Sequence, residues 1–230
     1  MAQAPLSPNV LTKSSIYIAL RSPIWASTVL RHAMPNSLTI GLIADTHMPG
    51  SMTELWPEAL AFLASSDVIL HAGDLHTLDI VNVLSEIAPT YVARGNGDVG
   101  IIDPRLQDQW QLDFMGFNIG MLHHCPSPAR KSEAVIRKHL AKHFSAPPDV
   151  VVFGHTHLES VTCFEGLTLI NPGSPTLPRN QSLQRGTLAR LAITTEACRV
   201  TLYQIGADQV EPHPVITPVD IPSTSLGISV

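Results

Sequence analysis

The sequence predicts an α/β fold built as a four-layer αββα sandwich, in which two mixed β-sheets pack face to face with helices outside. Strand patterns alternate with helical patterns in the first half of the chain, which indicates βαβαβ connections and a partly parallel sheet. Hairpin patterns dominate the second half, which indicates a second group of strands. Together these observations favour two packed sheets over a single open sheet or a barrel.

The βαβαβ half begins after Leu38. Short apolar runs indicate its strands, and stretches with helical periodicity between them indicate the crossover helices. The predicted elements are a strand over Thr39–Ala44, a helix over Glu54–Ser65, a strand over Val68–Ala72, a helix over Thr77–Ile87 and a strand over Tyr91–Ala93.

The second half contains two hairpin patterns and one further helix. Met115-Gly116 and Glu165-Gly166 are turn sequences, each between two apolar runs. The predicted elements are strands over Gln111–Phe114 and Phe117–Leu122, a helix over Ser132–Phe144, and strands over Val150–Phe153, Val161–Phe164, Leu167–Ile170, Thr187–Ile193 and Arg199–Ile205.

Size and composition favour one domain, predicted over residues 37–206. The chain has 230 residues and is 44% hydrophobic, enough for a single core. A net charge of −5 gives no basic surface of the kind that binds nucleic acid, so nucleic acid is not an expected partner. Three scattered cysteines provide neither a disulfide framework nor a cysteine-rich zinc site, which favours a reducing, cytoplasmic location.

The two ends of the chain differ from this domain. Residues 1–36 lack Asp and Glu, and two explanations stay open: a start assigned upstream of Met34, or organelle targeting by residues 1–33. Arg21 and Pro23 interrupt the apolar stretch Ile16–Leu30, so no membrane anchor is expected. Residues 207–230 are predicted to be a proline-rich tail, extended or disordered over Glu211–Val230.

Metal-binding residue types follow the ends of four predicted strands. One such residue after one strand would mean little, but strands of an open α/β sheet place their sites at their carboxyl ends. Two cations held roughly 3.5–4 Å apart can clamp a phosphoryl oxygen and ionise water at neutral pH. The sequence therefore predicts a two-metal hydrolase. The strings are Asp45-Thr46-His47, Gly73-Asp74, Gly95-Asn96 and Gly154-His155-Thr156-His157.

Spacing supports some of these residues more than others. Asp45 and His47 are two residues apart, as are His155 and His157, so each pair would point in one direction from an extended segment. Asp74 has two carboxylate oxygens and could bridge two cations. Two of the strings also have a simpler interpretation: Asp45 as an N-cap, and Asp74 as part of a turn.

Three further residues keep alternatives open. Asn96 offers an amide oxygen, but Asn-Gly is also a favoured turn. His123 and His124 both follow the strand over Phe117–Leu122, and sequence order does not choose the ligand between them. Cys125 could be redox-sensitive or an inert small side chain.

The order Asp-x-His, Gly-Asp, Gly-Asn, His, Gly-His-x-His resembles the calcineurin-like metallophosphoesterase superfamily over Leu38–Ile205. The string Asn171-Pro172-Gly173-Ser174 and the short chain resemble its YfcE-like phosphodiesterases, which share their fold with a retromer scaffold subunit. The resemblance implies that a water between two metals attacks phosphorus. It implies one metal held by Asp45, His47 and His157, a second held by Asn96, His123 and His155, and Asp74 bridging both.

The chain departs from the family pattern at two places. Gly97 stands where many relatives carry a histidine that donates a proton, and His123-His124-Cys125 replaces the usual His-Gly-His. His124 could supply the missing proton or serve as a plain spacer. Without that proton, leaving groups of low pKa should react best.

We therefore expect a phosphoric diester hydrolase that acts on small phosphodiesters with two divalent metal ions. Manganese is the metal that the resemblance implies, and iron, zinc, nickel or magnesium would also fit oxygen and imidazole ligands. The alternatives are a scaffold of the same fold and a phosphomonoesterase, which Gly97 disfavours. A homo-oligomer is compatible with the sequence.

Overall fold

The structure is a computed structural model that describes residues 36–222. The predictions for residues 1–33 lie outside this range and stay predictions. Within residues 36–222, none of the helices combines the length and apolar character needed to cross a bilayer.

The larger sheet is built around β1 (Ser37–Ile43). On one side β1 pairs in parallel with β2, with Ile40 opposite Val68, and on the other side it pairs antiparallel with β10, with Ile40 opposite Leu191. The remaining strands extend the sheet in both directions in the order β12-β11-β10-β1-β2-β3-β4, and β13 also pairs with β11. Their bounds are β2 Val68–His71, β3 Thr90–Ala93, β4 Leu106–Gln107, β10 Thr187–Thr194, β11 Ala197–Ile205, β12 Val210–Pro212 and β13 Val219–Pro222.

The smaller sheet has the order β5-β6-β7-β9-β8. It is mixed, because β6, β7 and β9 run parallel while the hairpins β5–β6 and β8–β9 are antiparallel. Its strands are β5 Gln109–Phe114, β6 Phe117–Leu122, β7 Val150–Val152, β8 Ser160–Phe164 and β9 Leu167–Asn171.

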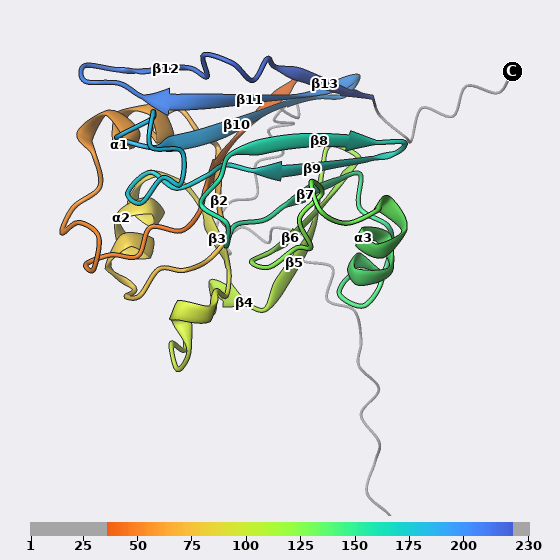
Figure 1. The fold of residues 1–230 in the computed structure, drawn as a ribbon, viewed down its shortest axis with the longest axis horizontal. Coiled ribbons are helices and arrows are strands. Elements are labelled where there is room, and N and C mark those ends of the chain that lie inside the picture. The colour runs from red at the N-terminus through yellow and green to blue at the C-terminus, as the bar shows by residue number, and fades with distance from the viewer. Residues whose placement is uncertain (1–35, 223–230) are drawn as a thin grey trace, which may run out of the picture. The chain divides into compact units, whose positions relative to one another are not determined.

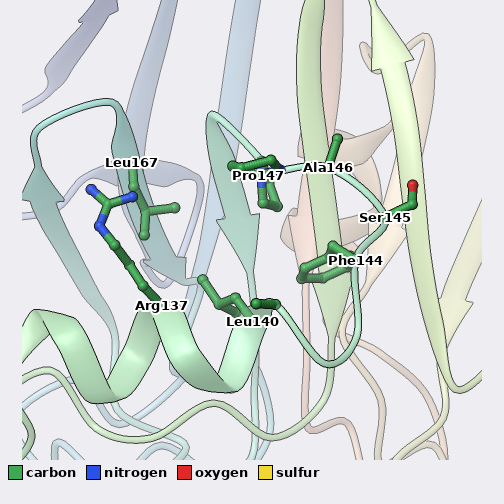
Figure 2. A pocket seen from close by; sticks show the side chains of 9 residues that line it. Arg137, Leu140, Phe144, Ser145, Ala146, Pro147 and Leu167 are labelled. Atoms are coloured by element: carbon green, nitrogen blue, oxygen red, sulfur yellow. The ribbon is translucent and has the colours of Figure 1, made fainter.

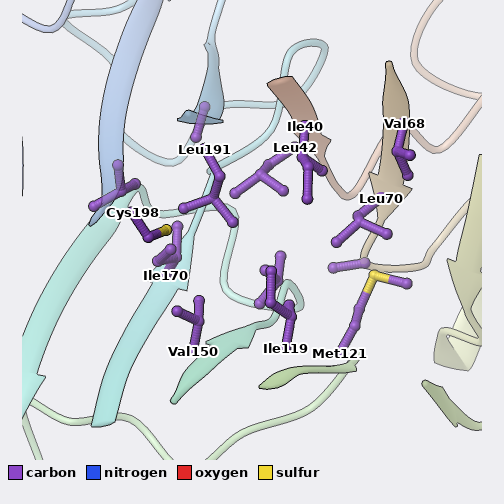
Figure 3. Close-up of a cluster of buried hydrophobic side chains, with 14 of the residues drawn as sticks. Ile40, Leu42, Val68, Leu70, Ile119, Met121, Val150, Ile170, Leu191 and Cys198 are labelled. Carbon is purple, nitrogen blue, oxygen red and sulfur yellow. The ribbon is translucent and has the colours of Figure 1, made fainter. Parts of the chain in front are cut away.

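Alternating apolar side chains hold the layers together. In β2, Val68 and Leu70 face the core between the sheets, whereas Ile69 faces the helices α1 (Pro57–Leu63) and α2 (Asp79–Ile87). Figure 3 shows the core between the sheets, with side chains from both.

A separate cluster covers the outer face of the smaller sheet. There Ile136 and Leu140 of α3 (Glu133–Leu140) pack on strands that include β7 through Val151. Figure 1 shows α1 and α2 beyond one sheet and α3 beyond the other. The predicted αββα sandwich is confirmed.

The helices are shorter than predicted. α1 begins at Pro57 and not at Glu54, because a proline lacks the N–H that the first turn leaves free and is favoured at the first helical position. α3 ends at Leu140, and the chain then forms turns that bring Phe144 against the small Gly120 of β6.

The prediction of an extended or disordered tail over Glu211–Val230 needs correction. β12 and β13 both pair with β11, and Ile221 of β13 is buried in the core between the sheets. The sequence shows no apolar alternation there because Ile221 is the sole residue of β13 that is fully buried. Residues 223–230 fall outside the described part of the chain.

Candidate metal centre

The candidate site lies in the loops that follow β1, β2, β3, β6 and β7. The larger sheet contributes four of the predicted residues and the smaller sheet contributes three. Hydrogen bonds or short contacts join side chains from both sheets, so the structure brings the whole predicted set together. These residues are Asp45, His47, Asp74, Asn96, His123, His155 and His157.

The first donor group consists of Asp45, His47 and His157, whose ligand atoms lie within 4.8 Å of one another. Nε2 of His47 is 3.0 Å from Nε2 of His157, which in turn is 3.9 Å from Oδ1 of Asp45. Nδ1 of His157 donates to the backbone carbonyl of Leu177 at 2.8 Å, so its Nε2 lone pair faces the group. This set of one carboxylate and two imidazoles suits a divalent cation.

The second donor group centres on the amide oxygen of Asn96. This oxygen is 3.1 Å from Nε2 of His123 and 3.0 Å from Nδ1 of His155. His123 donates through Nδ1 to the carbonyl of Ala72 at 2.7 Å, which leaves its Nε2 free to act as a ligand. The choice that the sequence left open is thus made by geometry, because His123 and not His124 faces Asn96.

Asp74 lies between the two groups. Its Oδ2 is 3.5 Å from Nε2 of His47 and 3.5 Å from Nε2 of His123, and its Oδ1 accepts a hydrogen bond from the backbone N–H of Gly97 at 2.7 Å. Burial raises the pKa of Asp74, but the interaction with the His123 ring and the hydrogen bond from the Gly97 N–H outweigh it and hold the pKa below its usual range. Asp74 is therefore an ionised carboxylate next to both sets of ligand atoms.

Asp45 provides the clearest sign that a cation fits here. Its side chain is fully buried, Oδ1 accepts the backbone N–H of His155 at 2.9 Å, and Oδ2 has no hydrogen-bond partner among the described residues. Burial raises the pKa of Asp45 to about 7, although nearby His123 and the His155 N–H lower it. A buried carboxylate oxygen without a partner is costly unless a cation compensates it.

The local backbone differs from the extended segments that the spacing argument assumed. Five of the ligand residues have left-handed φ angles, from 47° at His47 to 69° at His155. The two side chains of each pair, Asp45 with His47 and His155 with His157, were predicted to share a direction because they would alternate along an extended strand. That reason was wrong. Tight loops, and not pleated strands, turn these side chains toward one another. The five are Asp45, His47, Asp74, His155 and His157.

Asp98 is an organising residue that sequence reasoning missed. It is fully buried, and its two oxygens accept the backbone N–H groups of Asp74, Leu75, His76 and Gly95 at 2.7–3.1 Å. It thereby fixes the loop after β2 against the loop after β3. An acidic residue just after the Asn96-Gly97 turn was the available signal.

The remaining candidates lie at the edge of the site. The exposed ring of His124 has its centroid 4.9 Å from that of His155, so it is close enough to the second donor group for its proton-donor role to stay a prediction. Cys125 is buried, and burial raises its pKa to about 12, as expected for an inert thiol. His76, which the sequence did not single out, contacts His47 through Nε2 at 2.9 Å from Nδ1.

Comparison with known families supports this geometry. The model of the calcineurin-like phosphoesterase superfamily domain matches residues 38–196. The chain belongs to this superfamily. The name of the family is that of a phosphoesterase, and the donor groups described above are candidate metal ligands of this chain.

One sequence relative and two solved structures are similar to this superfamily member. A probable metallophosphoesterase of Methanothermobacter thermautotrophicus is 38% identical over 146 residues, which cover 62% of this chain and 80% of the relative. A predicted phosphoesterase from Streptococcus pneumoniae has a similar structure, with a TM-score of 0.57 and 17% identity, covering 81% of this chain and 98% of the other. Zinc-bound Vps29 from Entamoeba histolytica has a TM-score of 0.62 and 20% identity, covering 80% of this chain and 99% of the other.

Proposed function

We propose that this superfamily member is a phosphodiesterase that hydrolyses small phosphodiesters with two divalent metal ions. The observation that carries this proposal is the position of Asp74, whose Oδ2 is 3.5 Å from a ring nitrogen of each donor group. A single carboxylate shared by two ligand sets is the arrangement that two neighbouring cations require.

The residues divide into two sets of ligands. Asp45, His47 and His157 would hold one ion, and Asp74 would contact both. Asn96, His123 and His155 would hold the other ion. When bound, the cations would supply Lewis-acid activation of the phosphoryl group and of water. The protein supports them by fixing ring orientation, through Ala72 for His123 and Leu177 for His157.

Manganese is our proposed metal. The donor set contains two carboxylates, one amide oxygen and four imidazoles, which suits manganese, iron or zinc, and is compatible with nickel or magnesium. Zinc is bound by the related fold of Entamoeba histolytica Vps29, so zinc is the first metal to compare with manganese.

The preference for diesters needs a direct test, because the ring of His76 lies beside Gly97. A Cβ on Gly97 would lie 2.7 Å from Cδ2 of His76, so a different imidazole already occupies the space above this glycine. Although position 97 is not a histidine, the imidazole of His76 lies beside it.

The experiment strips the purified protein of metal, adds manganese back, and compares bis(p-nitrophenyl) phosphate with p-nitrophenyl phosphate. We expect manganese-dependent cleavage of the diester and much slower cleavage of the monoester. Asp74→Asn should lower diester turnover by at least ~100-fold, because it removes the shared charge. Asp208→Asn, at an exposed carboxylate outside the site, is the matched control and should retain full activity. Faster cleavage of the monoester would assign a phosphomonoesterase instead.

A scaffold role is the second candidate, and an apolar recess favours it. A cavity of about 330 Å³ lies between α3 and the chain that follows it, and its lining contains none of the candidate metal ligands. Figure 2 shows Leu140, Phe144, Pro147 and Leu167 around this space, with Arg137 at its side. Bound metal without turnover of either ester would favour this role.

A further inference from the structure

His76 lies directly behind a candidate ligand. Its Nε2 is 2.9 Å from Nδ1 of His47, and the two rings meet edge to face with centroids 4.6 Å apart. Nε2 of His47 is the ring nitrogen that faces Asp74 and His157. His76 therefore contacts the ligand ring on the side away from the donor group.

The tautomers of these rings are linked. When a cation binds Nε2 of His47, the ring proton must lie on Nδ1, and Nε2 of His76 must then accept it as a hydrogen bond. In the metal-free site, His157 donates through Nδ1 to Leu177 and so accepts from Nε2 of His47 at 3.0 Å. His76 must then donate to His47. An imidazole can exchange these two roles by changing its tautomer.

The backbone holds His76 in this place. The residue has a left-handed φ of 76°, and its N–H donates to Oδ1 of buried Asp98 at 3.1 Å. His47 is tied to the same loop, because its N–H donates to the carbonyl of Asp74 at 2.9 Å. The contact between the rings is thus a consequence of two loops that hydrogen bonds join.

Gly97 provides the space for the ring. A Cβ at this position would lie 2.7 Å from Cδ2 and 2.9 Å from Nε2 of His76, closer than real contacts allow. It would also lie 3.3 Å from Oδ1 of Asp74, a tighter contact than most. The φ of Gly97 is not left-handed, so alanine would meet a steric conflict there and no backbone strain.

We propose that His76 is the positioning residue for His47, holding its Nε2 toward the metal through a hydrogen bond at Nδ1, and that Gly97 is the glycine that makes room for it. This inference rests on the proposed function, because it assigns His47 as a metal ligand. Hydrogen-bond partners behind metal-bound histidines typically contribute ~10–100-fold to metal affinity.

The test measures manganese affinity by titration calorimetry on the metal-free full-length chain. We expect His76→Ala to weaken the affinity of one of the two ions by ~10–100-fold. His76→Gln, whose side-chain amide can also accept or donate, should stay within a few-fold of the wild type. His143→Ala is the control and should bind as the wild type, because the ring of His143 contacts His139, which is not a candidate ligand. Circular dichroism checks that each variant is folded.

Gly97→Ala adds a steric test of the same contact. Alone it should weaken manganese binding, because the methyl group displaces the His76 ring. In the His76→Ala background it should weaken binding much less, since only its contact with Asp74 remains. This non-additivity is the signature of a shared interaction. Equal effects of Gly97→Ala in both backgrounds would contradict the role of Gly97.

A spectroscopic readout is independent of activity. In zinc-loaded, ¹⁵N-labelled protein, Nδ1–H of His47 should give a slowly exchanging proton signal in the wild type and in His76→Gln, and no such signal in His76→Ala. Wild-type affinity in His76→Ala, or a loss in His76→Gln as large as in His76→Ala, would overturn the proposal. Failure of the wild type to bind manganese or zinc would instead contradict the proposed function.

Discussion

At the scale of single residues, the candidate site is marked by a carboxylate that the protein alone does not satisfy. Asp45 is fully buried and its Oδ2 lacks a hydrogen-bond partner among the described residues. Burial raises its pKa from 3.8 to about 7 in the metal-free site. Protonated Asp45 therefore makes its full contribution to the free energy of unfolding below about pH 4. This contribution is lost as the pH rises through about 7 and the buried carboxyl ionises.

Asp45→Asn should stabilise the metal-free protein at pH 8, where the wild type must keep a buried charge. We expect the Tm to rise by ~2–8 °C, as for the removal of ~1–2 kcal/mol of buried-charge cost. At pH 5 the gain should be smaller, since Asp45 is then mostly protonated. Thermal unfolding with chelator at both pH values measures this. A Tm gain that does not depend on pH would contradict the assignment.

The cysteines give a second prediction at this scale. Burial raises the pKa values of Cys125 and Cys198 to about 12, whereas Cys163 is exposed. Iodoacetamide at pH 8 should therefore modify Cys163 alone in the folded protein, because only an accessible thiolate reacts. Mass spectrometry would show one added group, and none in Cys163→Ser. Labelling of Cys125 would show that this thiol is accessible beside the metal ligands.

At the scale of elements, the last strand, β13, adds a residue to the structural core. Ile221 lies in β13, is 4% exposed, and packs in the cluster between the two sheets. Ile221→Ala should lower the free energy of unfolding by ~2–4 kcal/mol, as for other buried isoleucines. Val215→Ala is the control, because Val215 is 80% exposed and should change stability little. Urea denaturation compares them. Similar small losses in both would restore the interpretation of this region as a tail.

Elements also show where prediction from the sequence succeeded. The strands β1, β2 and β7 were predictable because their apolar runs are continuous and both faces are covered, as with Val150 and Val152 on one face and Val151 on the other. The clustering of the candidate ligands was predictable because metal-binding residue types follow the ends of these strands. β12 and β13 were not, since β12 buries no residue and β13 buries one, which leaves no period to detect.

The roles of Asp98 and His76 were hidden for another reason. Asp98 accepts N–H groups from residues more than 20 positions earlier, and His76 contacts His47 across 29 positions. Such contacts exist only once the loops after β1, β2 and β3 lie side by side. The local sequence does not distinguish a polar loop residue that makes such contacts from one that faces solvent.

At the scale of the whole molecule, the candidate metal centre joins the two sheets. Asp45 and Asp74 follow strands of the larger sheet, while His123 and His155 follow strands of the smaller one. A ligand that binds only the folded state stabilises all of it, by about 2.7 kcal/mol at a free concentration of 100 times its Kd. Metal binding at the candidate site would therefore stabilise both sheets together.

Calorimetry with and without chelator tests this coupling. Manganese should raise the Tm of the wild type by ~5–10 °C when in such excess, with one cooperative transition. Asp74→Asn should lose most of this shift, and the remote Asp208→Asn should keep it. A Tm that does not respond to manganese in the wild type would contradict metal binding in the folded state.

The left-handed loops have a consequence for how chains of this kind diverge. Five candidate ligands have φ angles that favour glycine, and a side chain there raises the energy of the backbone by ~1 kcal/mol or more. Binding of the proposed cations would offset this cost at these positions. Selection for stability alone would replace them with glycine. If these residues bind the proposed cations, glycine at positions 45, 47, 74, 155 and 157 in a descendant of this chain would record in its sequence that metal binding had been lost.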